Sequence, residues 1–142
     1  ILEDILPKGL IVYTEDKDGN RQEYTCSGEN ELELPLAVLV NGNSASASEI
    51  FAGAIQDYGT GTIVGTTTFG KGIVQSLIPF TDGSAIKTTT AKYYTPSGRC
   101  IHGTGIEPDV TVELAQGLEQ ENSISHEEDN QLQKAVEVVK GS

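Results

Sequence analysis

The strongest constraint on the fold is a short apolar run that leads directly into a helical pattern. Residues 36–40 read LAVLV, which has the length and composition of a β-strand covered on both faces. After a Gly-bearing turn, apolar side chains recur at helical spacing from Ala45 to Tyr58, and TIVGT at 62–66 has the pattern of a second buried strand. This order of strand, helix and strand predicts an α/β fold in which the run at 36–40 is central in its sheet.

Turn signals and composition divide the rest of the chain. Asp-Gly pairs at 18–19 and 82–83 each separate two strand-like runs, so we expect one hairpin over 9–27 and another over 72–94. A Gly- and Pro-rich loop follows the second hairpin. Polar and acidic residues at 115–128 predict a linker, and apolar residues three and four apart predict an amphipathic helix over 129–140.

The charge balance argues against two classes of partner. Nine Lys and Arg residues stand against 21 Asp and Glu residues, so the formal net charge is −12 and the surface repels nucleic acid and anionic lipid.

Cys26 and Cys100 are far apart and no histidines cluster, so no metal site is indicated, although a single bridge between the two thiols stays open. No apolar run approaches the ~20 residues that span a bilayer, and the N-terminus lacks the features of a signal peptide.

The serines at the start of the helical pattern have two interpretations. Ser46 and Glu49 form the S-x-x-E pattern of a capping box, and most such patterns only begin a helix. The position is nevertheless suited to chemistry, because reaction sites of α/β sheets gather where a strand ends. The free N–H groups of a helix N-terminus can also stabilise the oxyanion that forms when a hydroxyl attacks a carbonyl.

A serine hydroxyl needs a base that accepts its proton. The histidines are His102 and His126, and a Ser-His-Asp triad through His102 stays open, whereas a G-x-S-x-G elbow is absent. A lysine can serve instead when burial makes its amine neutral, which requires a pKa shift of about three units or roughly 4 kcal/mol. Lys71, flanked by glycines and an apolar run, is the candidate, and we expect its amine to be sheltered from water.

These residues stand in a segment that resembles a known family. The stretch VLVNGNSASASEIFAGAIQDYGTGTIVGTTTFGKGIVQS at 38–76 resembles the catalytic segment of the carboxyl-terminal processing peptidases, or tail-specific proteases, which use a Ser/Lys dyad. The resemblance covers residues 5–112, and DNQLQKAVEVV resembles the family's last helix. It implies a catalytic domain over 1–114 with an α/β fold, in which a mixed β-sheet with flanking helices forms the crotonase-like or ClpP-like core, incomplete at its N-terminal side.

The resemblance also implies roles for individual residues. Ser46 is the nucleophile, Lys71 is the general base 25 residues later, and Gln75 orients the lysine. The backbone N–H of Ala47 donates to the oxyanion. Asp57 matches an acidic position that some members use in support, but eleven residues of helix place it about 16 Å along the axis from Ser46, so a structural role stays equally open.

Further expectations concern the parts outside this segment. Family members carry a PDZ domain, an N-terminal helical part and an upstream glycine that completes the oxyanion hole. We expect this chain to begin after them and to be weakly active or inactive alone. The implied partners are protein substrates bound through their C-terminal tails, with no metal, cofactor or nucleic acid. The implied location is outside the cytoplasm, in the periplasm, at the envelope or secreted, and an exposed sheet edge favours a homodimer.

Two other interpretations stay open at this stage. One is a catalytically silent relative that uses the same scaffold to bind apolar ligands or peptide tails. The other is a plain α/β domain, in which the atoms of the Ser46 and Lys71 side chains lie beyond hydrogen-bond reach.

Overall fold

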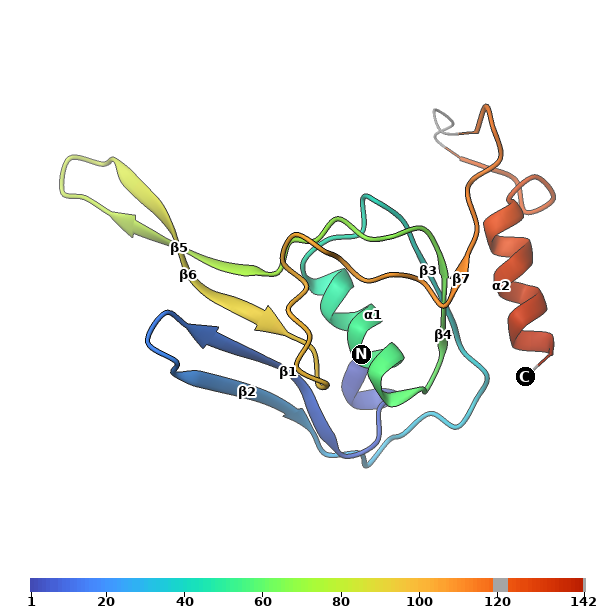
Figure 1. Ribbon diagram of the computed structural model, residues 1–142, viewed down its shortest axis with the longest axis horizontal. Coiled ribbons are helices and arrows are strands. Elements are labelled where there is room, and N and C mark those ends of the chain that lie inside the picture. Colours follow the sequence, from blue (N-terminus) through green and yellow to red (C-terminus); the bar gives the residue numbers. More distant parts are fainter. Residues whose placement is uncertain (119–122, 142) are drawn as a thin grey trace.

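The computed structural model describes residues 1–118 and 123–141 and shows two sheets on either side of a central helix (Figure 1). The helix α1 (Ala47–Tyr58) contacts β1 of one sheet and β4 of the other. A second helix, α2 (Asn130–Lys140), packs against β3 and β4 on the far side of their sheet. The α/β fold class expected from the sequence is confirmed.

The larger sheet is antiparallel and is built from two hairpins. Its order is β2-β1-β6-β5, and its strands are β1 (Gly9–Asp16), β2 (Arg21–Cys26), β5 (Ile73–Pro79) and β6 (Ala85–Tyr94). Both hairpins predicted from the Asp-Gly pairs are therefore confirmed. The β5–β6 hairpin extends past the β1–β2 turn as an arm, and β5 is an edge strand (Figure 1).

The smaller sheet is parallel and differs from the prediction in one respect. Its order is β3-β4-β7, with β3 (Ala37–Val40), β4 (Thr62–Gly65) and β7 (Val110–Thr111). The expectation that the run at 36–40 is central in its sheet is wrong, because β7 pairs with β4 and leaves β3 at the edge of the described sheet. Leu39 is accordingly 43% exposed.

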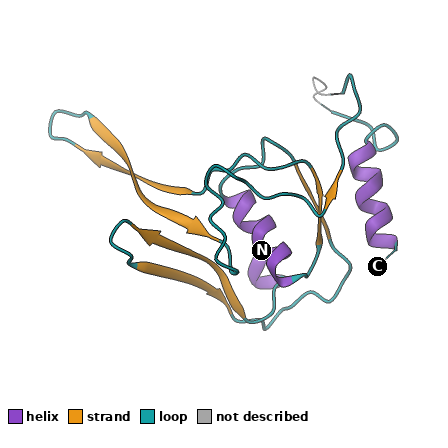
Figure 2. Cartoon of the chain, in the orientation of Figure 1, coloured by secondary structure: helices purple, strands orange, loops and turns teal. Residues whose placement is uncertain are grey.

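The two helices begin and end close to the predicted positions. The helix α1 ends at Tyr58 and is capped by Gly59, whose positive φ of 66° is the left-handed conformation that favours glycine. The helix α2 begins after Asp129, whose side chain accepts from the Leu132 N–H at 2.9 Å. A short 3₁₀ turn, η1 (Leu2–Asp4), precedes β1. The predicted linker at 115–128 falls partly outside the described residues, and the long connection between β6 and β7 is a loop (Figure 2).

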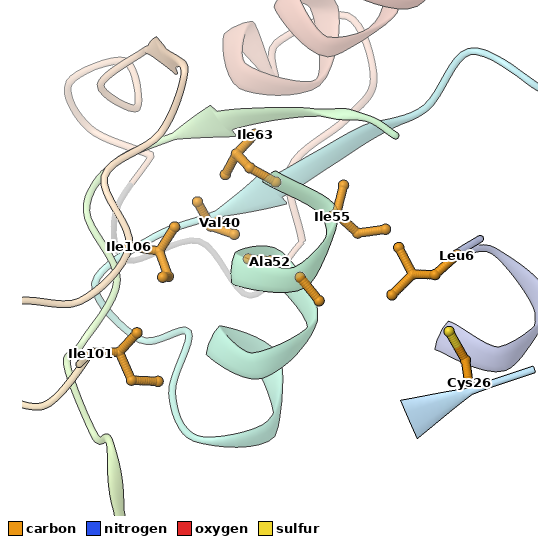
Figure 3. Close-up of a cluster of buried hydrophobic side chains, with 9 residues drawn as sticks. Leu6, Cys26, Val40, Ala52, Ile55, Ile63, Ile101 and Ile106 are labelled. Atoms are coloured by element: carbon orange, nitrogen blue, oxygen red, sulfur yellow. The ribbon is translucent and has the colours of Figure 1, made fainter. Parts of the chain in front are cut away.

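The core lies between α1 and the elements around it (Figure 3). Apolar side chains of α1 pack against the parallel sheet on one side and the β6–β7 loop on the other, while Leu6 and Cys26 close the end nearest the N-terminus. The buried cluster consists of Leu6, Cys26, Val40, Ala52, Ala54, Ile55, Ile63, Ile101 and Ile106. It anchors α1 within the fold.

The structure shows the state of the two cysteines and the character of the two helices. Cys26 is buried, Cys100 is partly buried, and both are free thiols, so the bridge left open by the sequence is not formed. Neither described helix has both the length and the apolar composition needed to span a bilayer.

Candidate active site

Ser46 occupies a strained position at the start of α1. The strand β3 ends at Val40, the chain turns through residues 41–45, and Ser46 is the N-cap of the helix with φ 57° and ψ −113°. Ser46 is the only non-glycine residue with a positive φ in the described part of the chain. Such a backbone costs about 1–3 kcal/mol and persists only where neighbouring contacts impose it, which makes the position a candidate for function.

Those contacts come largely from the buried carboxylate of Glu49, which is 0% exposed. Its Oε2 atom accepts from the backbone N–H of Ser46 at 2.9 Å and from that of Lys71 at 2.8 Å. Its Oε1 atom accepts from the Thr68 hydroxyl at 2.6 Å and from the Gly70 N–H at 2.6 Å. Because one oxygen holds both amides, the nitrogens of Ser46 and Lys71 lie no farther apart than the sum of those two distances.

Further backbone contacts fix the loop that carries the lysine. Phe69 N–H donates to the Ser44 carbonyl at 2.9 Å, so the loop is tied to the turn before α1. On the other side, Gly103 N–H donates to the Gly70 carbonyl at 2.9 Å. Gly70 has φ +85°, and a Cβ atom there would lie 3.1 Å from the Gly105 nitrogen, so the close approach of the two loops favours glycine. The backbones of the two candidate residues are therefore held together.

The side chain of Lys71 behaves differently from its backbone. It is exposed, and within residues 1–118 and 123–141 it makes no hydrogen bond or ion pair, including none with the hydroxyl of Ser46. The expectation that this amine is sheltered does not hold for this chain, because Glu49 restrains only the Lys71 backbone and no described element covers the side chain.

Gln75 is also exposed, and its amide makes no hydrogen bond to Lys71 among the described residues. Val74 lines a cavity together with Ile50 of α1. Because neighbouring residues of a strand point to opposite faces, the Gln75 side chain leaves the sheet on the face away from that cavity. An orienting contact between Gln75 and the lysine is therefore not formed in this structure.

Ala47 directly follows Ser46 in the chain. It is the first residue of α1, so its N–H has no acceptor within the helix and lies at the positive end of the helix dipole. Ala47 is exposed and Ser46 is half-buried, so a carbonyl group can approach this edge. The arrangement offers one donor to an oxyanion beside the Ser46 hydroxyl.

Asp57 lies at the other end of α1. Its side chain is 7% exposed and binds Arg99 Nη2 at 2.6 Å and the Ser97 N–H at 2.8 Å. Burial alone would raise the pKa of Asp57, but hydrogen bonds from Thr95 and Ser97 and the Arg99 guanidinium outweigh burial and lower that pKa. These contacts tie the helix to the β6–β7 loop, which is the structural role that the sequence left open.

The two histidines do not contact the serine. His102 and His126 are exposed, and neither imidazole bonds to Ser46 within the described residues. The backbone of His102 lies against Gly72, since a Cβ atom on that glycine would meet the His102 nitrogen at 2.5 Å.

In the part of the chain that the structure describes, no group of three or more His, Cys, Asp or Glu side chains could hold a metal ion.

The sequence pattern predicts only one of the four hydrogen bonds that the Glu49 carboxylate accepts. The S-x-x-E spacing predicts its contact with the Ser46 N–H, but the contacts with Thr68, Gly70 and Lys71 lie 19–22 residues away in the chain. The helical pattern itself contains a signal that Glu49 contacts distant parts of the chain. Glu49 falls three residues before buried Ala52, on the apolar side of α1, where a carboxylate requires donors from elsewhere in the fold.

A serine held in a strained turn between a strand and a helix N-terminus is the arrangement of hydrolases that act through a covalent serine intermediate. The comparisons with known proteins specify this class. Residues 1–112 match peptidase family S41, and the chain belongs to that family of serine-type peptidases.

Individual relatives agree with this assignment. The chain is 46% identical over 136 residues to a carboxyl-terminal-processing protease of Synechocystis sp., which covers 96% of this chain and 31% of the relative. It is 49% identical over 115 residues to a carboxy-terminal-processing protease of Bartonella bacilliformis, with 80% of this chain and 26% of the relative covered. The resemblance to the carboxyl-terminal processing peptidases that the sequence predicts is confirmed.

A solved structure gives the same result for the fold. The photosystem II D1 C-terminal processing protease superposes with a TM-score of 0.74 at 40% identity, over 78% of this chain and 29% of that protein. The chain thus spans about a third or less of the length of the relatives that it matches.

Proposed function

We propose that this chain supplies the nucleophile and the general base of a serine endopeptidase that cleaves protein substrates near their C-termini. The observation that carries the proposal is the shared hydrogen bonding of Glu49, whose Oε2 atom accepts from the amides of both Ser46 and Lys71. This contact keeps the two residues adjacent although they are 25 positions apart in the chain.

In the proposed mechanism, the Ser46 hydroxyl attacks the carbonyl carbon of the scissile bond and its proton passes to the neutral amine of Lys71. The N–H of Ala47 donates to the oxygen that becomes negative. Lys71 then gives the proton to the leaving amine, so the C–N bond breaks and an ester to Ser46 forms. Water hydrolyses the ester by the reverse proton path, and Gln75 is the proposed orienting group for the amine. No metal or cofactor takes part.

This mechanism requires a change around Lys71. A free amine has a pKa near 10.4, and its proton must be destabilised by roughly 4 kcal/mol before it can act as a base at pH 7. An exposed side chain does not provide that desolvation. We therefore propose that the 142-residue chain alone is weakly active or inactive, and that covering Lys71 within the complete protein makes it a base.

The exposure of Lys71 also favours a second candidate function. In a catalytically silent relative, the same scaffold would bind apolar ligands or peptide tails and the amine would stay protonated. A fluorophosphonate probe separates the two, because only an activated serine reacts with it. The complete protein should be labelled at Ser46, and unlabelled protein with intact peptide binding would support the silent module.

The variants Ser46→Ala and Lys71→Ala test the dyad in peptide hydrolysis by the complete protein. Both should abolish turnover, whereas Lys87→Ala, which removes an exposed lysine on the β5–β6 arm, should keep it. Full activity of Ser46→Ala or Lys71→Ala would refute the assignment.

Three expectations about context belong to the same proposal. The substrates are proteins bound through their C-terminal tails, and the location is outside the cytoplasm, as the sequence resemblance to the processing peptidases implies. Edge strands such as β5 expose unpaired backbone groups, which favours a homodimer. Light scattering that finds only a monomer at high concentration would count against the dimer.

A further inference from the structure

Thr68 lies between the Glu49 carboxylate and a loop that takes no part in the proposed mechanism. Its side chain is 6% exposed, and its hydroxyl donates to Glu49 Oε1 at 2.6 Å. The Thr68 hydroxyl oxygen also accepts from the backbone N–H of Ile106 at 2.7 Å, and the Thr68 N–H donates to the Ile106 carbonyl at 3.1 Å. Thr68 is therefore joined to the β6–β7 loop through both its backbone and its side chain.

The direction of the Thr68 hydroxyl proton follows from these contacts. A threonine hydroxyl has one hydrogen to donate, and its oxygen can also accept. Because the Ile106 N–H can only donate, the oxygen accepts from it and the single hydrogen points to the carboxylate of Glu49. A valine at this position would have a similar shape but could make neither bond.

The surroundings leave the Thr68 hydroxyl little room to move. A Cβ atom added to Gly105 would lie 2.9 Å from Thr68 Oγ1, so the two segments approach closely. The β6–β7 loop is also anchored at this point, because Ile106 is fully buried in the core cluster of Figure 3. Thr68 thus connects Oε1 of Glu49 to a densely packed part of the fold.

A restraint on Oε1 also restrains Oε2, because the two oxygens of a carboxylate are fixed relative to each other. Oε2 accepts from the N–H groups of Ser46 and Lys71. The other donor to Oε1 is the N–H of Gly70, which is the direct neighbour of Lys71 and cannot hold the carboxylate independently of it. Among the described donors to this carboxylate, Thr68 is therefore the one that ties it to the core.

We propose that Thr68 is a positioning residue of the peptidase. Its hydroxyl fixes the Glu49 carboxylate, and the carboxylate in turn sets where the Ser46 hydroxyl and the Lys71 amine lie relative to each other. This inference rests on the proposed function. Removing the hydroxyl should slow the reaction of Ser46 by about 10- to 100-fold, because small displacements of reacting groups have effects of this size.

Thr68→Val and Thr68→Ser test the hydroxyl in the complete protein. The valine variant should be labelled at Ser46 by a fluorophosphonate about 10- to 100-fold more slowly than the parent. The serine variant restores the hydroxyl and should react within about threefold of the parent rate. Circular dichroism at the assay temperature gives the folded fraction. Because the rate scales with that fraction, a tenfold slower reaction of a mostly folded variant does not come from unfolding.

Thr95→Val is the matched control. Thr95 is 3% exposed, and its hydroxyl shares a hydrogen bond with the Ser97 hydroxyl at 3.1 Å. The substitution removes the same group from an equally buried threonine that does not contact Glu49. It should therefore lower stability but keep the labelling rate of Ser46 within about twofold.

Hydrogen exchange in the ¹⁵N-labelled 142-residue chain tests the same link without catalysis. In Thr68→Val the N–H groups of Ser46 and Lys71 should exchange at least about tenfold faster, because their shared acceptor is no longer held. The N–H of Ile63, which donates to the Asp109 carboxylate at 2.7 Å, serves as the internal reference. Its exchange should accelerate less than that of the two site amides.

Several results would overturn the proposal. These are an unchanged labelling rate in Thr68→Val, a Thr68→Ser variant as slow as Thr68→Val, equal slowing in Thr95→Val, and exchange that accelerates equally at Ile63 and at the two site amides. If the parent protein is not labelled at Ser46, the peptidase proposal fails, but hydrogen exchange still decides whether Thr68 holds the two backbones. The two failures are therefore distinguishable.

Discussion

Replacing Glu49 by glutamine should weaken both the fold and the candidate site. The carboxylate accepts four hydrogen bonds inside the protein, two at each oxygen. Glutamine keeps the shape but turns one acceptor into an NH₂ donor. In one orientation this nitrogen faces the N–H groups of Ser46 and Lys71, and in the other it faces the N–H of Gly70. At least one buried donor therefore loses its acceptor in either case.

The magnitude follows from the cost of an unpaired buried donor, which is about 1–3 kcal/mol. Glu49→Gln leaves one or two donors unpaired, and the new NH₂ group also faces them and repels them. We therefore expect it to lower the free energy of unfolding by about 2–4 kcal/mol. For a chain of this size the melting temperature should fall by about 5–15 °C. Because Lys71 is held through the same carboxylate, labelling of Ser46 by a fluorophosphonate in the complete protein should slow as well.

Thermal unfolding followed by circular dichroism measures the first effect. Glu113→Gln removes the same charge from an exposed position and should change the free energy of unfolding by less than about 0.5 kcal/mol. If Glu49→Gln melts within the error of the parent chain and is labelled at the same rate, the four hydrogen bonds do not restrain the site and the reasoning is refuted.

Three further changes probe single contacts by thermal unfolding. Asp57→Asn should lower stability at pH 7 by about 1–3 kcal/mol. Since the folded pKa of Asp57 is lowered, this loss should be complete above the unfolded value near 3.9 and should vanish as the pH falls through the folded value. Ser46→Gly should raise stability by about 1 kcal/mol by relieving the positive φ, while it removes all labelling. Gly53→Ala should destabilise, because its Cβ atom would lie 2.8 Å from Thr95 Cγ2.

Each of these expectations has a contrary result. If the stability lost in Asp57→Asn does not change with pH, the charge of the Asp57 carboxylate does not stabilise the fold. A less stable Ser46→Gly variant would mean that the serine hydroxyl contributes more than the backbone strain costs. A Gly53→Ala variant with raised stability would mean that helix propensity outweighs the contact with Thr95.

The elements predicted best from the sequence are those with local signals. Asp-Gly pairs at 18–19 and 82–83 predict hairpins because the turn and the adjacent strands lie within a few residues of one another. The helical spacing before Gly59 likewise predicts α1. The edge position of β3 was missed because it depends on where β7 pairs, about 70 residues later in the chain.

The same distinction holds for the candidate site. Ser46, Ala47 and Lys71 could be selected from their pattern and family resemblance, but no local pattern predicts the positive φ of Ser46. The exposure of the Lys71 side chain depends on which elements of the fold cover it. The glycines and the apolar strand next to Lys71 in the sequence do not predict whether any element does. The linking role of Glu49 required the fold, since its partners come from two separate segments of the chain.

The most direct test of the account is the site of fluorophosphonate attachment in the complete protein, identified by mass spectrometry of the labelled peptide. We predict modification of Ser46 that depends on Lys71, so that it is lost in Lys71→Ala and kept in Lys87→Ala. No modification, modification at another serine, or unchanged labelling of Lys71→Ala would contradict the claim that these two residues act together.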